Sequence, residues 1–145
     1  MKNAKYILTA ALLWSAAASC ASPVVPGTYT MLGSRTAAAG CGGSPPSGSL
    51  GAASAVISAP DSSGAFTMVM QIGSGNPCVL SLSGGGGITD AHSCDATIAP
   101  PFFPVGVGSL ENTGNSLRLT VRWSMTGAGS NTMCWTDDVW VEARR

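Results

Sequence analysis

The amino-acid sequence predicts an all-β protein: a small antiparallel up-and-down β-barrel, or a barrel-like sandwich, that follows an N-terminal signal peptide. Three observations support this prediction. Apolar and polar residues alternate with a period of two in several segments, which is typical of half-buried strands. Clusters of Gly, Pro, Asn and Asp separate these segments, and no helical period follows the leader. The 145 residues have room for one domain.

The first 20 residues form the predicted signal peptide. Lys2 and Lys5 precede an apolar stretch over residues 6–14, and small residues follow it at 15–21. A positive segment, a short apolar segment and a small-residue cleavage site are the parts of a secretory signal. The apolar stretch falls short of the roughly 18 residues that span a bilayer. We therefore expect an exported mature protein without a transmembrane helix.

Cys20 ends the predicted leader, and it makes the cysteine count odd. Residues 17–20, Ala-Ala-Ser-Cys, resemble the lipobox of bacterial lipoproteins, in which the cysteine becomes the lipidated N-terminus. The resemblance implies that a lipid on Cys20 attaches the protein to a membrane. Because no Asp follows the cysteine, it also implies the outer membrane. The alternative is cleavage by ordinary signal peptidase after Ala18 or Ala21, which would leave a periplasmic or secreted protein.

The mature chain carries few charges. Without the leader, five arginines stand against seven carboxylates, which gives a net charge of −2. Nucleic-acid binding needs a basic surface that releases counterions. The charge balance therefore excludes nucleic acid as a partner.

The segments after the leader divide into a tether and one β domain. We expect residues 21–26, with their two prolines, to be a tether, and residues 27–145 to form the domain. Within the domain, the Gly, Ala, Ser and Pro of residues 36–51 predict a long loop. The alternation that predicts strands is clearest in residues 66–72 and 117–126. In each of these strands we therefore expect the alternating apolar residues to face the interior of the barrel.

Four further cysteines predict two disulfides, because exported domains of this size are commonly cross-linked. The glycine run at residues 84–87 lies midway between Cys78 and Cys94, so a hairpin about it places these two cysteines opposite one another. This register favours the pairs Cys78–Cys94 and Cys41–Cys134, although the count alone permits three pairings. Each bridge is expected to stabilise the fold by about 2–4 kcal/mol.

A short motif at the start of the domain is similar to the lipocalin and avidin-like barrels. Gly27-Thr28-Tyr29, continuing to Leu32-Gly33-Ser34, resembles the glycine-plus-aromatic opening of their first strand, with Tyr in place of the usual Trp. It covers less than a tenth of the chain. The resemblance implies an eight-stranded up-and-down barrel with a ligand-holding mouth and says nothing about the ligand.

One carboxylate is in phase with an apolar set. Asp137 alternates with Trp135 and the valines that follow it, so it would point into the barrel if that phase holds. A buried carboxylate beside aromatic rings is typical of ligand pockets, which predicts a small-ligand site at Trp123, Trp135 and Asp137. The alternative, which we favour, is a bulge over residues 136–138 that turns Asp137 to solvent while the tryptophans fill the core.

No motif predicts a catalytic or metal site. The single histidine, His92, has Asp90 and Cys94 on its own strand face, but this set is too small for zinc if Cys94 forms a disulfide. No serine lies in a nucleophile elbow, and the glycine run lacks the Lys of a phosphate loop. Asp137 and Asp138 are adjacent and would face opposite sides of a strand. We therefore expect no enzyme activity, no cofactor and no metal.

The function that these observations favour is a cell-envelope binding module for a small apolar ligand or a protein partner. The first alternative is an inhibitor of an exogenous hydrolase, such as a protease or a lysozyme. Its contact loop would be residues 96–105, where Phe102 and Phe103 lie between prolines. If these two rings are buried, they plug a barrel end instead. The second alternative is a structural component of the envelope.

Overall fold

The computed structural model describes residues 22–40, 46–92, 103–126 and 133–143. Within these ranges the chain is all β, with eight strands and no helix. In chain order the strands are β1 (Gly27–Ala39), β2 (Gly48–Ile57), β3 (Phe66–Ile72), β4 (Cys78–Leu82), β5 (Ile88–His92), β6 (Phe103–Asn112), β7 (Leu117–Thr126) and β8 (Met133–Glu142).

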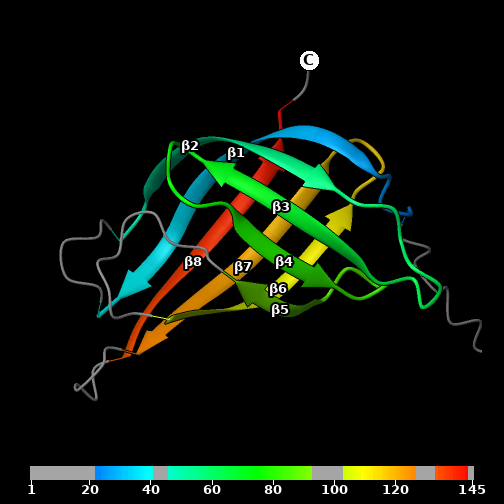
Figure 1. Cartoon of the computed structure of the whole chain (residues 1–145). Coiled ribbons are helices and arrows are strands. Elements are labelled where there is room, and N and C mark those ends of the chain that lie inside the picture. The colour runs from blue at the N-terminus through cyan, green and yellow to red at the C-terminus, as the bar shows by residue number, and fades with distance from the viewer. Residues whose placement is uncertain (1–21, 41–45, 93–102, 127–132, 144–145) are drawn as a thin grey trace, which may run out of the picture.

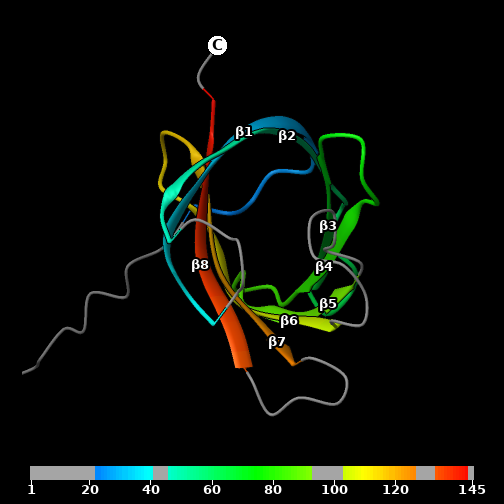
Figure 2. The same ribbon diagram turned by 90° about the vertical axis from the view of Figure 1, so that its left-hand side faces the viewer.

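All the strands form one antiparallel sheet that curls into a barrel. The sheet order is β5-β4-β3-β2-β1-β8-β7-β6, so β1 pairs with β8 and the two edge strands are β5 and β6. Strand twist and tilt allow such a sheet to close on itself. Figure 1 shows the barrel from the side, and Figure 2 shows the strands arranged as a ring. The predicted up-and-down barrel is confirmed, in a nearly closed form.

The barrel interior contains the apolar sets that the alternation predicted on β3, β4 and β7. On β3, for example, Phe66 and Met68 are buried and the intervening Thr67 is exposed. Full burial of one such side chain contributes about 1.5–3 kcal/mol. The buried apolar cluster consists of Met31, Ala53, Ala55, Ile57, Phe66, Met68, Met70, Cys78, Leu80, Leu82, Leu110, Leu117, Leu119, Val121 and Trp140.

The loop expected over residues 36–51 is shorter than the composition suggested. β1 continues to Ala39 and β2 begins at Gly48, so both ends of this stretch are strand. Small side chains are compatible with a strand when its neighbours supply hydrogen bonds, and the end of β1 pairs with β8. The register between β1 and β8 shifts between Arg35 and Ala37, where β1 contains one extra residue.

The glycine run forms the predicted β4–β5 hairpin turn and also helps to close the barrel. The N–H of Leu110 on β6 donates to the carbonyl of Gly86 over 2.8 Å, and Gly87 forms an isolated antiparallel bridge with Ser109. Gly86 has φ of +82°, and a Cβ there would overlap the Leu110 carbonyl oxygen. The turn can approach β6 this closely only because it has no side chain.

Trp123 packs against β6 near the seam between the edge strands β5 and β6. Its ring lies against Gly106 on β6, where an added Cβ would come within 2.6 Å of the ring. That same Cβ position is 3.1 Å from Ala91 on β5. Trp123 is half-buried against the core cluster. The Trp123 ring therefore lies against β6, near the place where β6 approaches Ala91 of β5.

Residues 22–26, the described part of the predicted tether, cap one end of the barrel. The Asn112 side chain donates a 2.8 Å hydrogen bond to the Pro23 carbonyl, and the Tyr29 hydroxyl donates a 2.6 Å bond to the Val25 carbonyl. Between them, Val24 packs against the core cluster. In Figure 2 this blue segment passes across the ring. We call this end, where β1 begins and β6 finishes, the capped end; at the far end β1 finishes and β8 begins.

Cys78 and Cys134 are buried, and neither is a free thiol. Cys78 begins β4 and Cys134 lies near the start of β8, so both are at the far end. Cys41 and Cys94 lie outside the described residues, as does Cys20. The two disulfide pairings therefore remain predictions.

Candidate functional site

The inner face of β8 carries Thr136 and Asp138, not the Trp135 and Asp137 of the predicted ligand site. Asp138 is 4% exposed and Thr136 is 1% exposed, and they share this inner face with Cys134 and Trp140. Asp137 therefore points outward, as the favoured alternative expected, and the hypothesis that put it inside the barrel is wrong. The register between β7 and β8 is regular throughout, so no bulge in β8 turns Asp137 out. The irregularity lies opposite it, in β1.

Asp138 is paired inside the barrel with Arg35, which lies on the same face of β1 as the buried Met31 and Gly33. The Arg35 Nε donates to Oδ1 over 2.8 Å and its Nη2 donates to Oδ2 over 3.2 Å. The side chains of Arg35 and Asp138 are 15% and 5% exposed. A buried carboxylate is tolerated when it is paired and hydrogen-bonded in this way.

Thr136 completes the group. Its Oγ1 is buried, and it has no hydrogen-bond partner among the residues that the structure describes. Buried hydroxyls almost always have a partner, and leaving one unsatisfied costs about 1–3 kcal/mol. Thr136 is two residues from Asp138 on the same strand face, and it lies directly opposite Trp123 in the β7–β8 ladder. We call Arg35, Thr136 and Asp138 the polar cluster.

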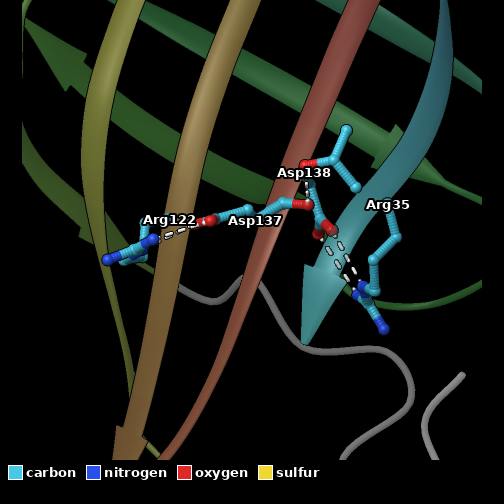
Figure 3. Close-up of polar contacts among 5 residues, drawn as sticks. Arg35, Arg122, Asp137 and Asp138 are labelled. Atoms are coloured by element: carbon cyan, nitrogen blue, oxygen red, sulfur yellow. Dashed lines mark hydrogen bonds and ion pairs between the residues drawn. The ribbon is translucent and has the colours of Figure 1, made fainter. Parts of the chain in front are cut away.

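A second arginine–aspartate pair lies on the outer surface, one residue along β8. The Arg122 Nε and Nη2 donate to the two oxygens of Asp137 over 2.6 and 2.7 Å. The Arg122 guanidinium also lies 4.6 Å from the centre of the Trp135 ring. The hydrogen bond from Arg122 is the largest influence on the Asp137 carboxyl and lowers its pKa. Figure 3 shows the two aspartates leaving β8 toward different neighbouring strands.

The three residues of the predicted ligand site are thus not brought together. Trp123 is on the inner face, whereas Trp135 and Asp137 are on the outer face. The favoured alternative also predicted that both tryptophans fill the core. This prediction is only partly correct, because Trp123 packs against the core cluster and Trp135 does not. The inward carboxylate is Asp138.

Sequence reasoning missed the polar cluster, although a signal was available. Arg35 follows Met31 and Gly33 at every second position, and Asp138 stands two residues before Trp140. Arg35 on β1 and Asp138 on β8 are therefore each in phase with a bulky apolar residue. Two opposite charges of this kind on different strands could have suggested a buried pair.

The side chains of the other residues considered for a site, His92, Phe102 and Phe103, are not described by the structure. Phe102 lies outside the described residues, and so does the Phe103 side chain, although Phe103 begins β6. Of His92 only the backbone is described. In the described part of the chain, no three His, Cys, Asp or Glu side chains gather as metal ligands would. Nor does that part contain a helix long and apolar enough to cross a bilayer.

The polar cluster can recognise a ligand through hydrogen bonds. A guanidinium has five N–H donors, and Asp138 uses two of those on Arg35. The Thr136 hydroxyl can donate or accept, and the neighbouring Trp123 ring offers an apolar face. Comparisons with known proteins add no further guide: no family model, curated protein or solved structure matches the chain.

Proposed function

We propose that this protein is an exported, non-enzymatic binding module of the cell envelope, and that it takes a small, largely apolar ligand at the polar cluster. The observation that carries the proposal is the buried Thr136 Oγ1, which has no hydrogen-bond partner within the described ranges of the chain. It lies beside a buried ion pair and opposite a half-buried tryptophan. Convergent polar groups next to an aromatic wall are how small-molecule sites are usually built.

The charge of the cluster limits the ligand. Asp138 already neutralises Arg35 through two hydrogen bonds, so an anion would gain little net attraction. An uncharged head group with a carbonyl or hydroxyl oxygen fits better, because it can accept from the remaining Arg35 donors and pair with Thr136. Its apolar body would lie against Trp123.

Export and anchoring form the second part of the proposal. The leader directs the chain out of the cytosol, and a lipid on Cys20 attaches it to the outer membrane. An oxidising compartment allows the two predicted disulfides. The register supports their pairing: Val79, next to Cys78, pairs with His92, two residues before Cys94. Similarly Trp135, next to Cys134, pairs with Ala39, two residues before Cys41. Two residues span at most about 7 Å.

Native mass spectrometry of the protein purified from its own envelope tests the binding proposal. We expect a retained small molecule in the wild type. Thr136→Val keeps the side-chain shape and removes the hydroxyl, so it should lower occupancy or affinity by about 2–10-fold, the value of one hydrogen bond.

Thr120→Val is the matched control, because Thr120 is exposed on the outer face of β7, and it should retain the wild-type occupancy. Wild-type protein without a retained molecule would refute the proposal. Equal occupancy in the two variants would refute the site.

A further inference from the structure

The N-terminal segment leaves the barrel in a defined place. Asn112 holds Pro23 over 2.8 Å, Tyr29 holds Val25 over 2.6 Å, and Val24 is packed between them against the core cluster. A flexible tether would let the barrel turn freely about its anchor. These three contacts instead fix the last residues before β1 to the capped end.

The distance from this segment to the anchoring residue is short. Cys20 is three residues before Pro23, and three extended residues span about 10 Å at most. A lipid on Cys20 would therefore hold the capped end within about 10 Å of the bilayer surface. The far end is not held near the bilayer by the anchor. Strands of ten residues, tilted against the barrel axis, place it roughly 25–30 Å further from the bilayer surface than the capped end.

The capped end has a surface that suits close approach to lipid head groups. Val25 is 56% exposed there, between the exposed Pro23 and Pro26. The exposed residues of the β6–β7 turn, 113–115, are uncharged. Asp61 in the β2–β3 turn is charged, but its carboxylate accepts hydrogen bonds within its own turn. The β6–β7 turn and residues 23–26 can therefore approach the head groups without desolvating a charge, whereas the charged Glu111, Arg118 and Glu142 lie in the strands behind them.

We propose that the capped end faces the bilayer and that the far end, where β1 finishes and the polar cluster lies, points into the aqueous space. The inference rests on the lipid anchor of the proposed function. It names the partner of the capped end as a lipid bilayer surface. It also gives the ligand site a direction: ligands reach the polar cluster from the side away from the membrane.

Fluorescence quenching on vesicles tests this orientation. Full-length precursor is expressed, processed and purified from membranes as two labelled variants, Asn115→Cys at the capped end and Ser74→Cys in the β3–β4 turn at the far end. Both positions are exposed. Each is reconstituted into phosphatidylethanolamine and phosphatidylglycerol vesicles that contain a head-group quencher. We expect several-fold stronger quenching at residue 115 than at residue 74.

A second pair of variants tests whether the cap sets the orientation. Asn112→Asp removes the donor to Pro23 but keeps the acceptor that holds the Gly114 N–H over 2.9 Å. This change should narrow the quenching difference. Asn76→Asp, an exposed residue at the far end, is the control for the added charge and should leave the difference unchanged.

The outcomes separate the two proposals. Intact mass without a lipid on Cys20 would refute the anchor and, with it, the orientation. Lipidated protein with equal quenching at the two labels, or stronger quenching at residue 74, would refute the orientation alone. An Asn112→Asp protein that keeps the full wild-type difference would show that the cap contact does not set it.

Discussion

Two adjacent aspartates on β8 each bind an arginine through both carboxylate oxygens, yet we expect very different effects when they are replaced. Asp138→Asn leaves the buried Arg35 charge without its partner, and breaking a buried pair costs about 3–5 kcal/mol. The Asp138 and Arg35 side chains are only 5% and 15% exposed, so water cannot compensate fully. Asparagine keeps one acceptor oxygen, which places the expected loss near the lower end, at about 3 kcal/mol.

Urea unfolding at neutral pH, with the disulfides intact, measures this loss. Domains of this size have slopes of about 1–3 kcal/mol per molar urea, so a loss of about 3 kcal/mol lowers the midpoint by about 1–3 M. Asp137→Asn is the matched variant. The side chain of its partner Arg122 is 56% exposed, and exposed ion pairs contribute little to stability. The urea midpoint of Asp137→Asn should therefore match that of the wild type within the scatter of replicate measurements.

A double variant separates loss of the charge pair from damage to packing. Replacing both partners, Arg35→Met with Asp138→Leu, removes both buried charges and should recover most of the stability that Asp138→Asn loses. Equal midpoints for Asp138→Asn and Asp137→Asn would refute our account of the polar cluster. So would a double variant less stable than Asp138→Asn.

Three further predictions concern packing, closure and the outer ion pair. Gly33→Ala places a Cβ 2.5 Å from the buried Trp140 ring, so thermal unfolding should show a loss of about 1–3 kcal/mol from overpacking. Gly86→Ala introduces a side chain at φ +82° against the β6 backbone, so amide exchange should accelerate along the β5–β6 seam before the rest of the barrel. NMR titration should give Asp137 a pKa below 3.8, because Arg122 lowers it, and Arg122→Gln should raise that pKa toward the ordinary value. The stabilisation by this pair is complete above pH 3.8 and is lost as the pH falls through the lower folded-state pKa.

Gly85→Ala is the control for both glycine variants. Gly85 is exposed in the same turn as Gly86, and an added Cβ there meets nothing closer than 4.0 Å. Its unfolding curve and exchange pattern should match the wild type. Loss of stability in Gly85→Ala would mean that the whole turn tolerates no side chain, which contradicts the role given to close approach at Gly86. A normal Asp137 pKa in the wild type would contradict the outer ion pair.

The alternation of apolar and polar residues was sufficient to predict which residues face the core in most strands, because in those strands the inward face is consistently the more apolar one. In β7, Leu117, Leu119 and Val121 face the core and the residues between them include Arg118 and Thr120. The buried and exposed sets have different hydropathy, and the period alone assigns them. The same holds for β3 and for the hairpin of β4 and β5, whose glycine run predicted the turn.

β8 shows why the candidate site could not be assigned in the same way. Its inward set includes Thr136 and Asp138, whereas its outward set includes Trp135 and Val139, so the outer face is the more apolar one locally. The inward carboxylate is acceptable only because Arg35 pairs with it across 103 residues of chain. Period analysis within one strand carries no information about a partner so far away.

The two ends of β1 were misjudged for a related reason. Residues 36–39 have the composition of a loop, but β8 supplies backbone partners for them. The segment before β1 has two prolines, as tethers often do, but Asn112 and Tyr29 bind its carbonyl groups. In both places a contact from a strand distant in sequence, β8 for residues 36–39 and β6 for Pro23, outweighs local propensity.

The most direct test of the binding account is a high-resolution experimental structure of the protein purified from its own envelope, inspected at Thr136. We predict a small organic molecule with an oxygen within hydrogen-bond distance of Thr136 Oγ1 and an apolar part against the Trp123 ring. A Thr136 hydroxyl satisfied by water alone, or by another side chain of the protein, would contradict the account.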